Sequence, residues 1–139
     1  MAETIFTSKA TVEGGREGHV RSEDGMIDVN LEQPGSGSSK SGSNPEQLFA
    51  SGYAACFDGM LNLQASKKNK DVSSKTTAAV SLQKDESDGM FQLAAELTVE
   101  ISGVSKEEAD ELVDLAHQYC PYSKATRNNI EVKVQSEVK

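Results

Sequence analysis

The sequence predicts an α+β fold in which two antiparallel groups of strands surround a long central helix. Two observations indicate it. Alternating, β-branched segments cluster at 3–31, 72–101 and 130–135, and a helical segment separates each cluster from the next. The expected order of elements is therefore βββ-α-ββ-α-β. The length and the absence of an internal repeat fit a single domain over 1–139.

The first group contains three short strands separated by turn signals. A Gly14-Gly15 pair ends the first strand, and Asp24-Gly25 predicts the hairpin turn between the second and the third. The Gly/Ser-rich residues 34–43 predict a flexible loop that leads into the central helix. The three strands are expected at 3–13, 19–22 and 26–31.

The central helix is expected over 44–66 and carries the first of only two cysteines. Asn44 suits the N-cap and Pro45 the first helical position. The middle of the helix is thin, because Gly52 and Gly59 each cost about 1 kcal/mol relative to alanine in a helix interior. We therefore expect another backbone or a ligand to approach this helix closely.

The second half of the chain predicts a hairpin, a second helix and a last strand. The helix begins after Ser105, a good N-cap residue, has acidic residues in its first turn, and ends at Cys120-Pro121. A turn through 127–129 follows it. The three strands alternate apolar and polar residues and are expected at 72–83, 90–101 and 130–135.

Charge and hydropathy exclude several classes of partner. A net charge of -8 and a pI near 4.7 disfavour nucleic acid and anionic lipid, which both select clustered Lys and Arg. Apolar runs are too short to span a membrane, and the polar start lacks the features of a signal peptide, so we expect a cytoplasmic protein. The half-buried sheets and the thin helix leave apolar surface for a second copy to cover, which predicts a homodimer.

The two cysteines, Cys56 and Cys120, lie too far apart in the sequence for a small disulfide framework or a zinc site. The two histidines, His19 and His117, stand in unrelated contexts, and no glycine-rich phosphate loop follows a strand. We therefore expect neither a bound metal nor a bound cofactor.

A separated pair of cysteines on helices suggests thiol redox chemistry. A thiolate attacks a peroxide, becomes a sulfenic acid, and is captured by the second thiol as a disulfide. The attacking thiol needs a fixed cation to lower its pKa from about 8.5. Arg16, after Gly14-Gly15, is the candidate cation, and a solvated loop arginine is the alternative. For Cys56 the alternative is an inert core thiol.

Four stretches together resemble the organic hydroperoxide resistance (Ohr) branch of the OsmC/Ohr family. They are Gly14-Gly15-Arg16, 44–50, Ala55-Cys56-Phe57 and 120–127, in the order and spacing of the family. The resemblance implies an intertwined homodimer and a thiol peroxidase that reduces organic hydroperoxides, including those of fatty acids, to alcohols. It also implies an external reductant, a dihydrolipoyl group on a lipoylated partner protein.

The resemblance assigns roles to four residues. It makes Cys56 the peroxidatic thiolate and Cys120 the resolving thiol. Arg16 would stabilise the thiolate and polarise the peroxide, and Glu46 would hold Arg16. One position departs from the family, because Asn128 stands where glycine is common. Asparagine tolerates positive φ better than most residues, so we expect the turn to be kept.

Apolar side chains near Cys56 are expected to form the substrate pocket. Burial of each methylene of an organic tail contributes about 0.8 kcal/mol, so such a pocket would favour organic hydroperoxides over hydrogen peroxide. The alternative is that these residues only fill the core. The predicted pocket residues are Phe49, Tyr53, Phe57 and Met60.

Helix geometry bears on how the site is assembled. Ten residues separate Glu46 from Cys56, which is about 15 Å along an unbroken helix. If Arg16 contacts both, it stretches between levels of the helix, the helix breaks, or one group comes from the other subunit. We predict the last, with Arg16 or Glu46 acting in trans.

Two other functions use the same residues. The first is a thiol redox sensor or small-ligand-binding protein without significant turnover. The second is a structural dimer with inert thiols, in which Cys56 reacts slowly and with an ordinary pKa.

Overall fold

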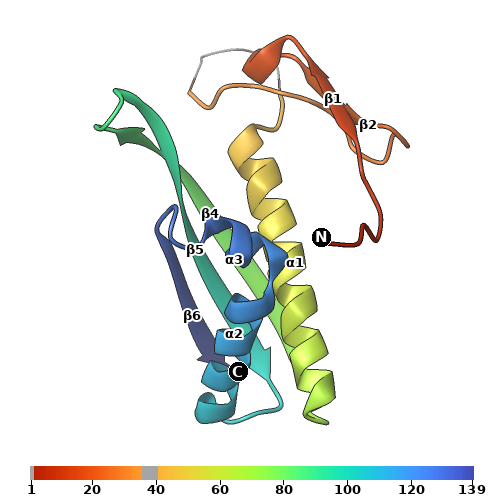
Figure 1. The fold of residues 1–139 in the computed structure, drawn as a ribbon, viewed down its shortest axis with the longest axis vertical. Coiled ribbons are helices and arrows are strands. Elements are labelled where there is room, and N and C mark those ends of the chain that lie inside the picture. Colours follow the sequence, from red (N-terminus) through yellow and green to blue (C-terminus); the bar gives the residue numbers. More distant parts are fainter. Residues whose placement is uncertain (1, 36–40) are drawn as a thin grey trace. The chain divides into compact units, whose positions relative to one another are not determined.

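The computed structural model describes residues 2–35 and 41–139, so part of the predicted loop at 34–43 lies outside the described residues. The chain contains two compact units, Met1–Leu48 and Phe49–Lys139. Figure 1 shows the elements of both units, which we describe separately.

The first unit is built on a three-stranded antiparallel sheet with the order β1-β2-β3. A 3-10 turn, η1, follows β1. The unit ends within the first turn of helix α1 (Pro45–Lys67). The Asp24-Gly25 turn is confirmed, with Gly25 at a φ of 77°. The elements are β1 (Ala10–Glu13), η1 (Gly15–Glu17), β2 (His19–Ser22) and β3 (Asp28–Asn30).

The three predicted strands of this unit exist, but the first is shorter than predicted. Residues 3–9 are not in a strand, although their sequence favours one. Their apolar side chains are exposed, with Ile5 at 84% and Phe6 at 80%. Because strand propensity reflects packing on a half-buried surface, a segment whose apolar side chains stay exposed gains little from forming a strand.

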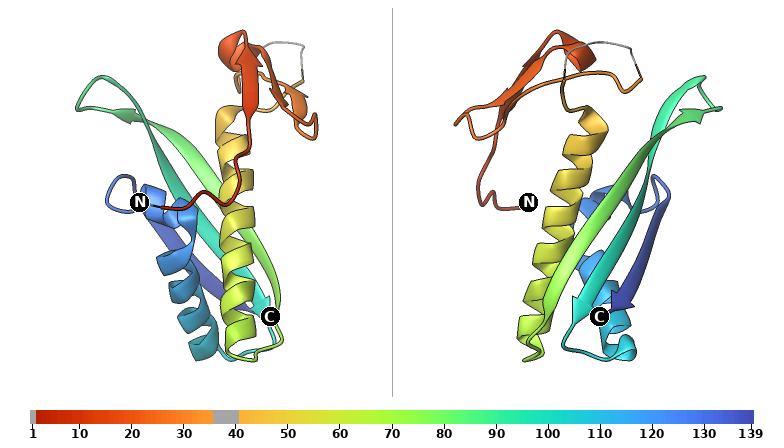
Figure 2. Two further views of the ribbon diagram at one scale, coloured as in Figure 1. Left: turned by 45° about the vertical axis from the view of Figure 1, so that its right-hand side comes forward. Right: turned by 180° about the vertical axis from the view of Figure 1, so that it is seen from behind.

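The second unit places two helices on one face of a three-stranded sheet, as the two views of Figure 2 show. The sheet has the order β4-β5-β6. Helix α1 crosses the boundary of the two units, and its bounds are Pro45–Lys67. The other elements are β4 (Ser73–Asp85), β5 (Met90–Ser102), α2 (Lys106–Tyr119), α3 (Pro121–Thr126) and β6 (Val132–Val138).

The direction of β6 corrects the expectation of a purely antiparallel group. Strands β4 and β5 pair antiparallel over their whole length, but β6 pairs parallel to β5. The cause is the helical connection: α2 returns the chain to the end of the sheet where β5 began, so the next strand runs in the same direction. The second sheet is therefore mixed.

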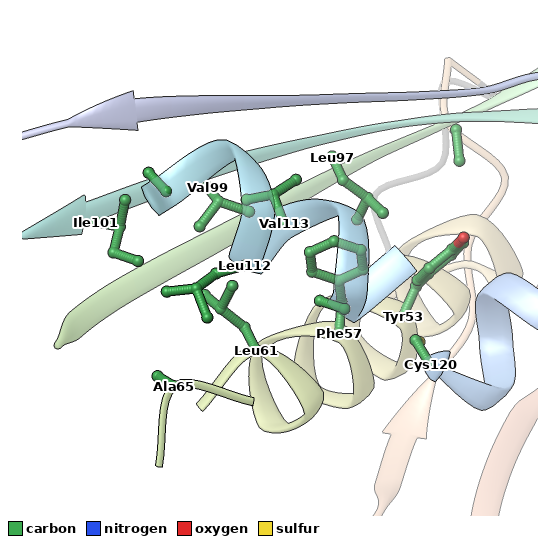
Figure 3. Close-up of a cluster of buried hydrophobic side chains, with 13 residues drawn as sticks. Tyr53, Phe57, Leu61, Ala65, Leu97, Val99, Ile101, Leu112, Val113 and Cys120 are labelled. Carbon is green, nitrogen blue, oxygen red and sulfur yellow. The ribbon is translucent and has the colours of Figure 1, made fainter. Parts of the chain in front are cut away.

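The core of the second unit lies between the helices and the sheet. Strand β5 alternates as predicted, with Leu97, Val99 and Ile101 fully buried and Glu96 exposed on the other face. Figure 3 shows Phe57 and Leu61 of α1 and Leu112 of α2 reaching into this layer. The sheet thus has one apolar face and one polar face.

Both predicted helix caps are present. Asn44 Oδ1 accepts a hydrogen bond from the backbone N–H of Gln47 at 2.7 Å. Ser105 and Glu108 form a reciprocal capping box at the start of α2. The short helix α3 was not predicted, because six residues are too few to show a helical period. Within the described residues, no helix is both long and apolar enough to cross a membrane.

Candidate functional site

The structure brings the two cysteines into contact. Cys56 lies on α1 and is partly exposed, whereas Cys120 is fully buried between α2 and α3. The Cys120 thiol donates to Cys56 Sγ at a distance of 3.3 Å. A disulfide bond is about 2.05 Å long, so a movement of little more than 1 Å would join the sulfurs. Both thiols are free.

The surroundings of Cys56 within the second unit favour the neutral thiol. Burial is the largest effect and raises the pKa of Cys56 above its ordinary value. The neighbouring Cys120 thiol raises it further, while the backbone N–H of Tyr122 donates to the sulfur and lowers it. A thiolate at neutral pH therefore needs a further favourable charge.

The sequence analysis expects another backbone or a ligand close to the thin part of α1, but the group that approaches Gly52 is the side chain of Tyr122. A Cβ at Gly52 would lie 2.6 Å from Tyr122 Oη and 3.1 Å from Cζ. The ring packs against the bare helix backbone, and the same residue supplies the N–H that bonds to Cys56. The structure gives no such reason for Gly59, because no described atom lies within 4 Å of a Cβ built there.

Arg16 and Glu46 form the predicted pair in the first unit. Arg16 Nη1 donates to Glu46 Oε1 at 2.8 Å, and Nη2 donates to Oε2 at 2.9 Å. Gly14 and Gly15 precede the arginine with φ values of 83° and 62°, which glycine adopts without strain. The pairing raises the pKa of Arg16 and lowers that of Glu46. The Arg16 guanidinium is therefore held in place by two parallel hydrogen bonds to one carboxylate.

The predicted contact between Arg16 and the Cys56 sulfur joins the two units and stays a prediction. Helix α1 runs without a break over Pro45–Lys67, which removes the alternative of a broken helix. Two alternatives are left for a single guanidinium that serves both Glu46 and Cys56: it stretches along the helix, or one group belongs to a second subunit.

The predicted pocket residues occupy three different places. Tyr53 and Phe57 are fully buried in the core, where Figure 3 shows them on the inner side of α1. Met60 is half-buried and lines a hollow with Tyr119 and Lys124. Phe49 lines an apolar groove of about 470 Å³ whose walls include Pro121, the residue after Cys120. Of the four, only Phe49 lies on the wall of this groove.

The other walls of the groove come from residues that the sequence analysis missed. They share no local pattern, since they lie on β5, on α3 and in the loop before β6. The ring of Tyr122 packs against Phe49 and Tyr53 with centroid distances of 5.9 and 5.7 Å. Besides Phe49, the lining residues are Gln92, Leu93, Pro121, Tyr122, Ala125, Thr126, Asn129 and Ile130.

The turn after α3 keeps the conformation that the sequence analysis expected. Asn128 has a φ of 61°, in the region where glycine or asparagine is tolerated. In the part of the chain that the structure describes, no group of three His, Cys, Asp or Glu side chains is arranged to hold a metal ion.

Comparisons with known proteins show the family to which the chain is similar. Residues 35–135 match the family described as OsmC-like protein. The chain is 48% identical over 132 residues to the organic hydroperoxide resistance protein OhrB of Bacillus subtilis (strain 168), covering 94% of this chain and 97% of that protein. It is 45% identical to OhrA of the same strain over 138 residues, covering 97% and 98%.

Solved structures give the same result for the fold. The crystal structure of Bacillus subtilis OhrB matches with a TM-score of 0.93 at 47% identity, covering 96% of this chain and all of that chain. A putative organic hydroperoxide resistance protein from Vibrio cholerae, with captopril bound in one of its active sites, matches with a TM-score of 0.89 at 40% identity, covering 96% and 93%. With its fold and its relatives in agreement, this chain belongs to the OsmC-like family and to the organic hydroperoxide resistance branch of it.

Proposed function

We propose that this protein is a thiol peroxidase that reduces organic hydroperoxides, including those of fatty acids, to alcohols. The observation that carries the proposal is the 3.3 Å contact between the Cys56 and Cys120 sulfurs. Free cysteines 64 positions apart in the chain, one of them fully buried, are in place to alternate between dithiol and disulfide. The names of the relatives supply the class of substrate.

In the first step the Cys56 thiolate attacks the outer oxygen of the hydroperoxide. The O–O bond breaks, the alkoxide takes up a proton and leaves as the alcohol, and Cys56 becomes a sulfenic acid. Arg16, held by Glu46, would stabilise the thiolate and polarise the peroxide from the same or the other subunit. This charge would offset the burial that raises the pKa of Cys56.

In the second step Cys120 captures the sulfenic acid, and water leaves as the disulfide forms. A dihydrolipoyl group on a lipoylated protein then reduces the disulfide. It transfers two electrons through two thiol–disulfide exchanges, becomes a cyclic disulfide, and returns both cysteines to thiols. No bound cofactor takes part in this cycle.

The organic tail of the substrate is proposed to lie in the apolar groove that Phe49 and Pro121 line. Its walls combine aliphatic and aromatic side chains, including Phe49, Leu93 and Ile130. Because each buried methylene contributes about 0.8 kcal/mol, a tail of a few carbons gains a large preference over hydrogen peroxide. The captopril in the related Vibrio cholerae structure supports an active site that admits a small organic molecule.

A homodimer with shared sites is part of the proposal. Apolar side chains are exposed in both units, with Ile5 and Phe6 in the first and Met90 and Phe91 in the second. A second copy that covers them would bury surface that one chain leaves in water. It would also allow Arg16 or Glu46 to reach the partner's thiol, which one continuous helix makes difficult.

A steady-state assay with cumene hydroperoxide and dihydrolipoamide tests the activity. The wild type is expected to turn over, whereas Cys56→Ser is expected to be inactive and Cys120→Ser to be oxidised once and then stop or overoxidise. Glutathione in place of dihydrolipoamide is expected to support little turnover. Equal rates in the wild type and Cys56→Ser would contradict the proposal.

Arg16→Ala tests the role of the guanidinium. Loss of the charge is expected to raise the pKa of Cys56 and to slow its oxidation. The measurement is the rate of Cys56 alkylation by iodoacetamide as a function of pH, with Cys120→Ser as the background. Arg21→Ala, which removes an arginine from the same unit, is the control. An unchanged pH profile in Arg16→Ala would remove Arg16 from the mechanism.

A thiol redox sensor or small-ligand-binding protein without significant turnover is the alternative. The raised pKa of Cys56 favours only the ligand-binding form of this alternative, since a neutral thiol reacts slowly with hydroperoxides and a sensor needs a thiolate as much as a peroxidase does. The same assay separates the two functions. A sensor is oxidised by cumene hydroperoxide but is not returned to the dithiol by dihydrolipoamide at a useful rate.

A further inference from the structure

A buried chain of hydroxyl groups lies beside the cysteine pair. The Tyr53 hydroxyl is 2.8 Å from Ser123 Oγ and 3.1 Å from Thr126 Oγ1. His117 Nδ1 lies 2.8 Å from the same Ser123 Oγ. Tyr53 and Ser123 are fully buried, and Thr126 is 5% exposed. The hydrogen bonds of Tyr53 therefore form away from water, so water does not readily replace a partner that is removed.

The hydrogen bond between Tyr53 and Ser123 runs parallel to the contact between the sulfurs. Tyr53 precedes Cys56 by three residues on α1, which puts the two side chains on neighbouring turns of one helix face. Ser123 follows Cys120 by three residues on α3. The hydroxyl contact and the sulfur contact thus join the same two elements one turn apart. Together they set the position of α3 against α1.

A second set of hydrogen bonds holds the corner at which Cys120 lies. His117, on the last turn of α2, bonds across Cys120 to Ser123. Arg127 Nη2 donates to the carbonyl oxygens of His117 at 2.6 Å and Gln118 at 3.3 Å. Burial, followed by the charge of Arg127, lowers the pKa of His117, so the ring bonds to Ser123 without burying a charge at neutral pH.

We propose that Tyr53 and Ser123 are positioning residues for the second chemical step. Their hydrogen bond holds the Cys120 thiol against Cys56, so that a sulfenic acid at Cys56 is captured as a disulfide before a second hydroperoxide reaches it. This inference rests on the proposed peroxidase function. Neither residue touches the reacting oxygen, and both act through the elements that carry the cysteines.

The rate of disulfide formation depends on how close the Cys120 sulfur lies to Cys56. The Cys120 sulfur attacks the Cys56 sulfur, the S–O bond breaks, and the leaving hydroxide takes the thiol proton and departs as water. The competing reaction is oxidation of the sulfenic acid by a second hydroperoxide to a sulfinic acid, which thiols do not reverse. Disulfide formation is faster than oxidation to the sulfinic acid only when the effective concentration of Cys120 at Cys56 is high.

Tyr53→Phe tests the proposal, because it removes the hydroxyl and keeps the ring. The reduced protein is mixed with cumene hydroperoxide and quenched at intervals with dimedone and an alkylating agent, and the masses of the products are measured. We expect Cys56 to be oxidised at the wild-type rate. We expect the disulfide to form roughly three- to tenfold more slowly, the loss of one buried hydrogen bond, with more sulfinic acid at high hydroperoxide.

Ser123→Ala removes the other partner of the same hydrogen bond. It is the variant to test if Tyr53→Phe folds poorly. It is expected to slow disulfide formation at least as much, since it also removes the bond to His117. The effects of the two changes are expected to add up to less than their sum in the double variant, because both remove the bond between Tyr53 and Ser123 and only the Tyr53 contact with Thr126 is lost in addition. Tyr119→Phe is the matched control: its side chain is 43% exposed, and neither step is expected to change.

The outcomes separate a positioning role from a general structural one. An unchanged rate of disulfide formation in both Tyr53→Phe and Ser123→Ala overturns the proposal. Equal slowing of Cys56 oxidation and disulfide formation also overturns it, since the hydroxyl chain would then support the whole site. Slowing confined to disulfide formation supports it.

A measurement without hydroperoxide distinguishes this proposal from the peroxidase proposal. In mixtures of reduced and oxidised dithiothreitol, Tyr53→Phe is expected to shift the equilibrium between dithiol and disulfide toward the dithiol by roughly three- to tenfold. If the wild type fails to react with cumene hydroperoxide but this shift is present, the peroxidase proposal fails and the positioning role stands. If there is no shift, the positioning role fails.

Discussion

Tyr122 is the single residue that connects the shape of helix α1 to the chemistry of Cys56. Its ring lies on the bare backbone at Gly52, and its backbone N–H donates to the sulfur. It also forms part of the groove wall beside Phe49. One residue after Pro121 therefore takes part in thiolate stabilisation, helix packing and the proposed substrate groove.

At the residue scale, we predict that Gly52→Ala weakens the site although alanine favours helix. The added Cβ would lie 2.6 Å from Tyr122 Oη, so the ring has to move. We expect the free energy of unfolding to fall by about 1–3 kcal/mol, as in other overpacked sites. We also expect the pKa of Cys56 to rise and iodoacetamide alkylation at pH 7 to slow, because the Tyr122 N–H is displaced.

Gly59→Ala is the matched control on the same helix. No described atom lies within 4 Å of the new methyl group, so the change is expected to stabilise the protein by up to about 1 kcal/mol through helix propensity. Urea unfolding and the alkylation rate are measured for both variants. Equal alkylation rates in Gly52→Ala and Gly59→Ala would show that Tyr122 does not act on the thiol.

At the scale of elements, the start of α2 is held by charge as well as by its cap. Glu108 accepts from the backbone N–H of Ser105 and pairs with Lys70 from the loop after α1. These contacts, with Lys70 first, lower the pKa of Glu108 to about 2. The ion pair with Lys70 thus links the start of α2, which leads to Cys120, to the loop that follows α1, which carries Cys56.

We predict that part of the stability is lost in acid through Glu108. Its pKa is lower in the folded protein than in the unfolded chain, so its contribution is present above about pH 4.5 and is lost as the pH falls toward 2. Urea unfolding of the wild type and Glu108→Gln is expected to give a difference at pH 7 that shrinks at pH 3. Ser105→Ala, which removes the cap itself, is expected to cost about 1 kcal/mol at both pH values. A constant difference for Glu108→Gln would contradict the role of its charge.

At the scale of the whole molecule, the exposed apolar residues bear on whether the protein forms a dimer. The apolar face of the hairpin formed by β4 and β5 extends beyond the helices, where Leu82 is 40% and Phe91 59% exposed. The segment before β1 exposes Ile5 and Phe6. Both sets are exposed in the described residues, which fits the proposed homodimer.

We predict that Phe91→Asp shifts the protein from dimer to monomer. A charge placed in an apolar interface has to be desolvated, which costs several kcal/mol and exceeds what one contact contributes. Sedimentation velocity at micromolar concentration measures the shift, and Glu96→Asp on the polar face of the same strand is the control. A wild-type protein that sediments as a monomer would refute the shared site. If Phe91→Asp dimerises like the wild type, Phe91 does not lie in the dimer interface.

Local pattern was enough for most of the elements. The caps at Asn44 and Ser105 and the alternation of β5 depend on neighbours in the sequence, so they could be predicted without the fold. The length of β1 and the parallel pairing of β6 could not be predicted in this way, since they depend on what packs beside a strand. The six residues of α3 carried no period to detect.

By itself, the sequence determined the α+β class and, through four short motifs, the family, and the resemblance to that family implied the pairing of Arg16 with Glu46. Only the tertiary structure decided that the Cys56 and Cys120 sulfurs lie 3.3 Å apart, that Tyr53 and Phe57 fill the core, and that Tyr122 lies on Gly52. The physical reason is that these contacts join side chains from elements distant in the chain. Their distances are set by how the helices pack on the sheet, and no local pattern of residues records that packing.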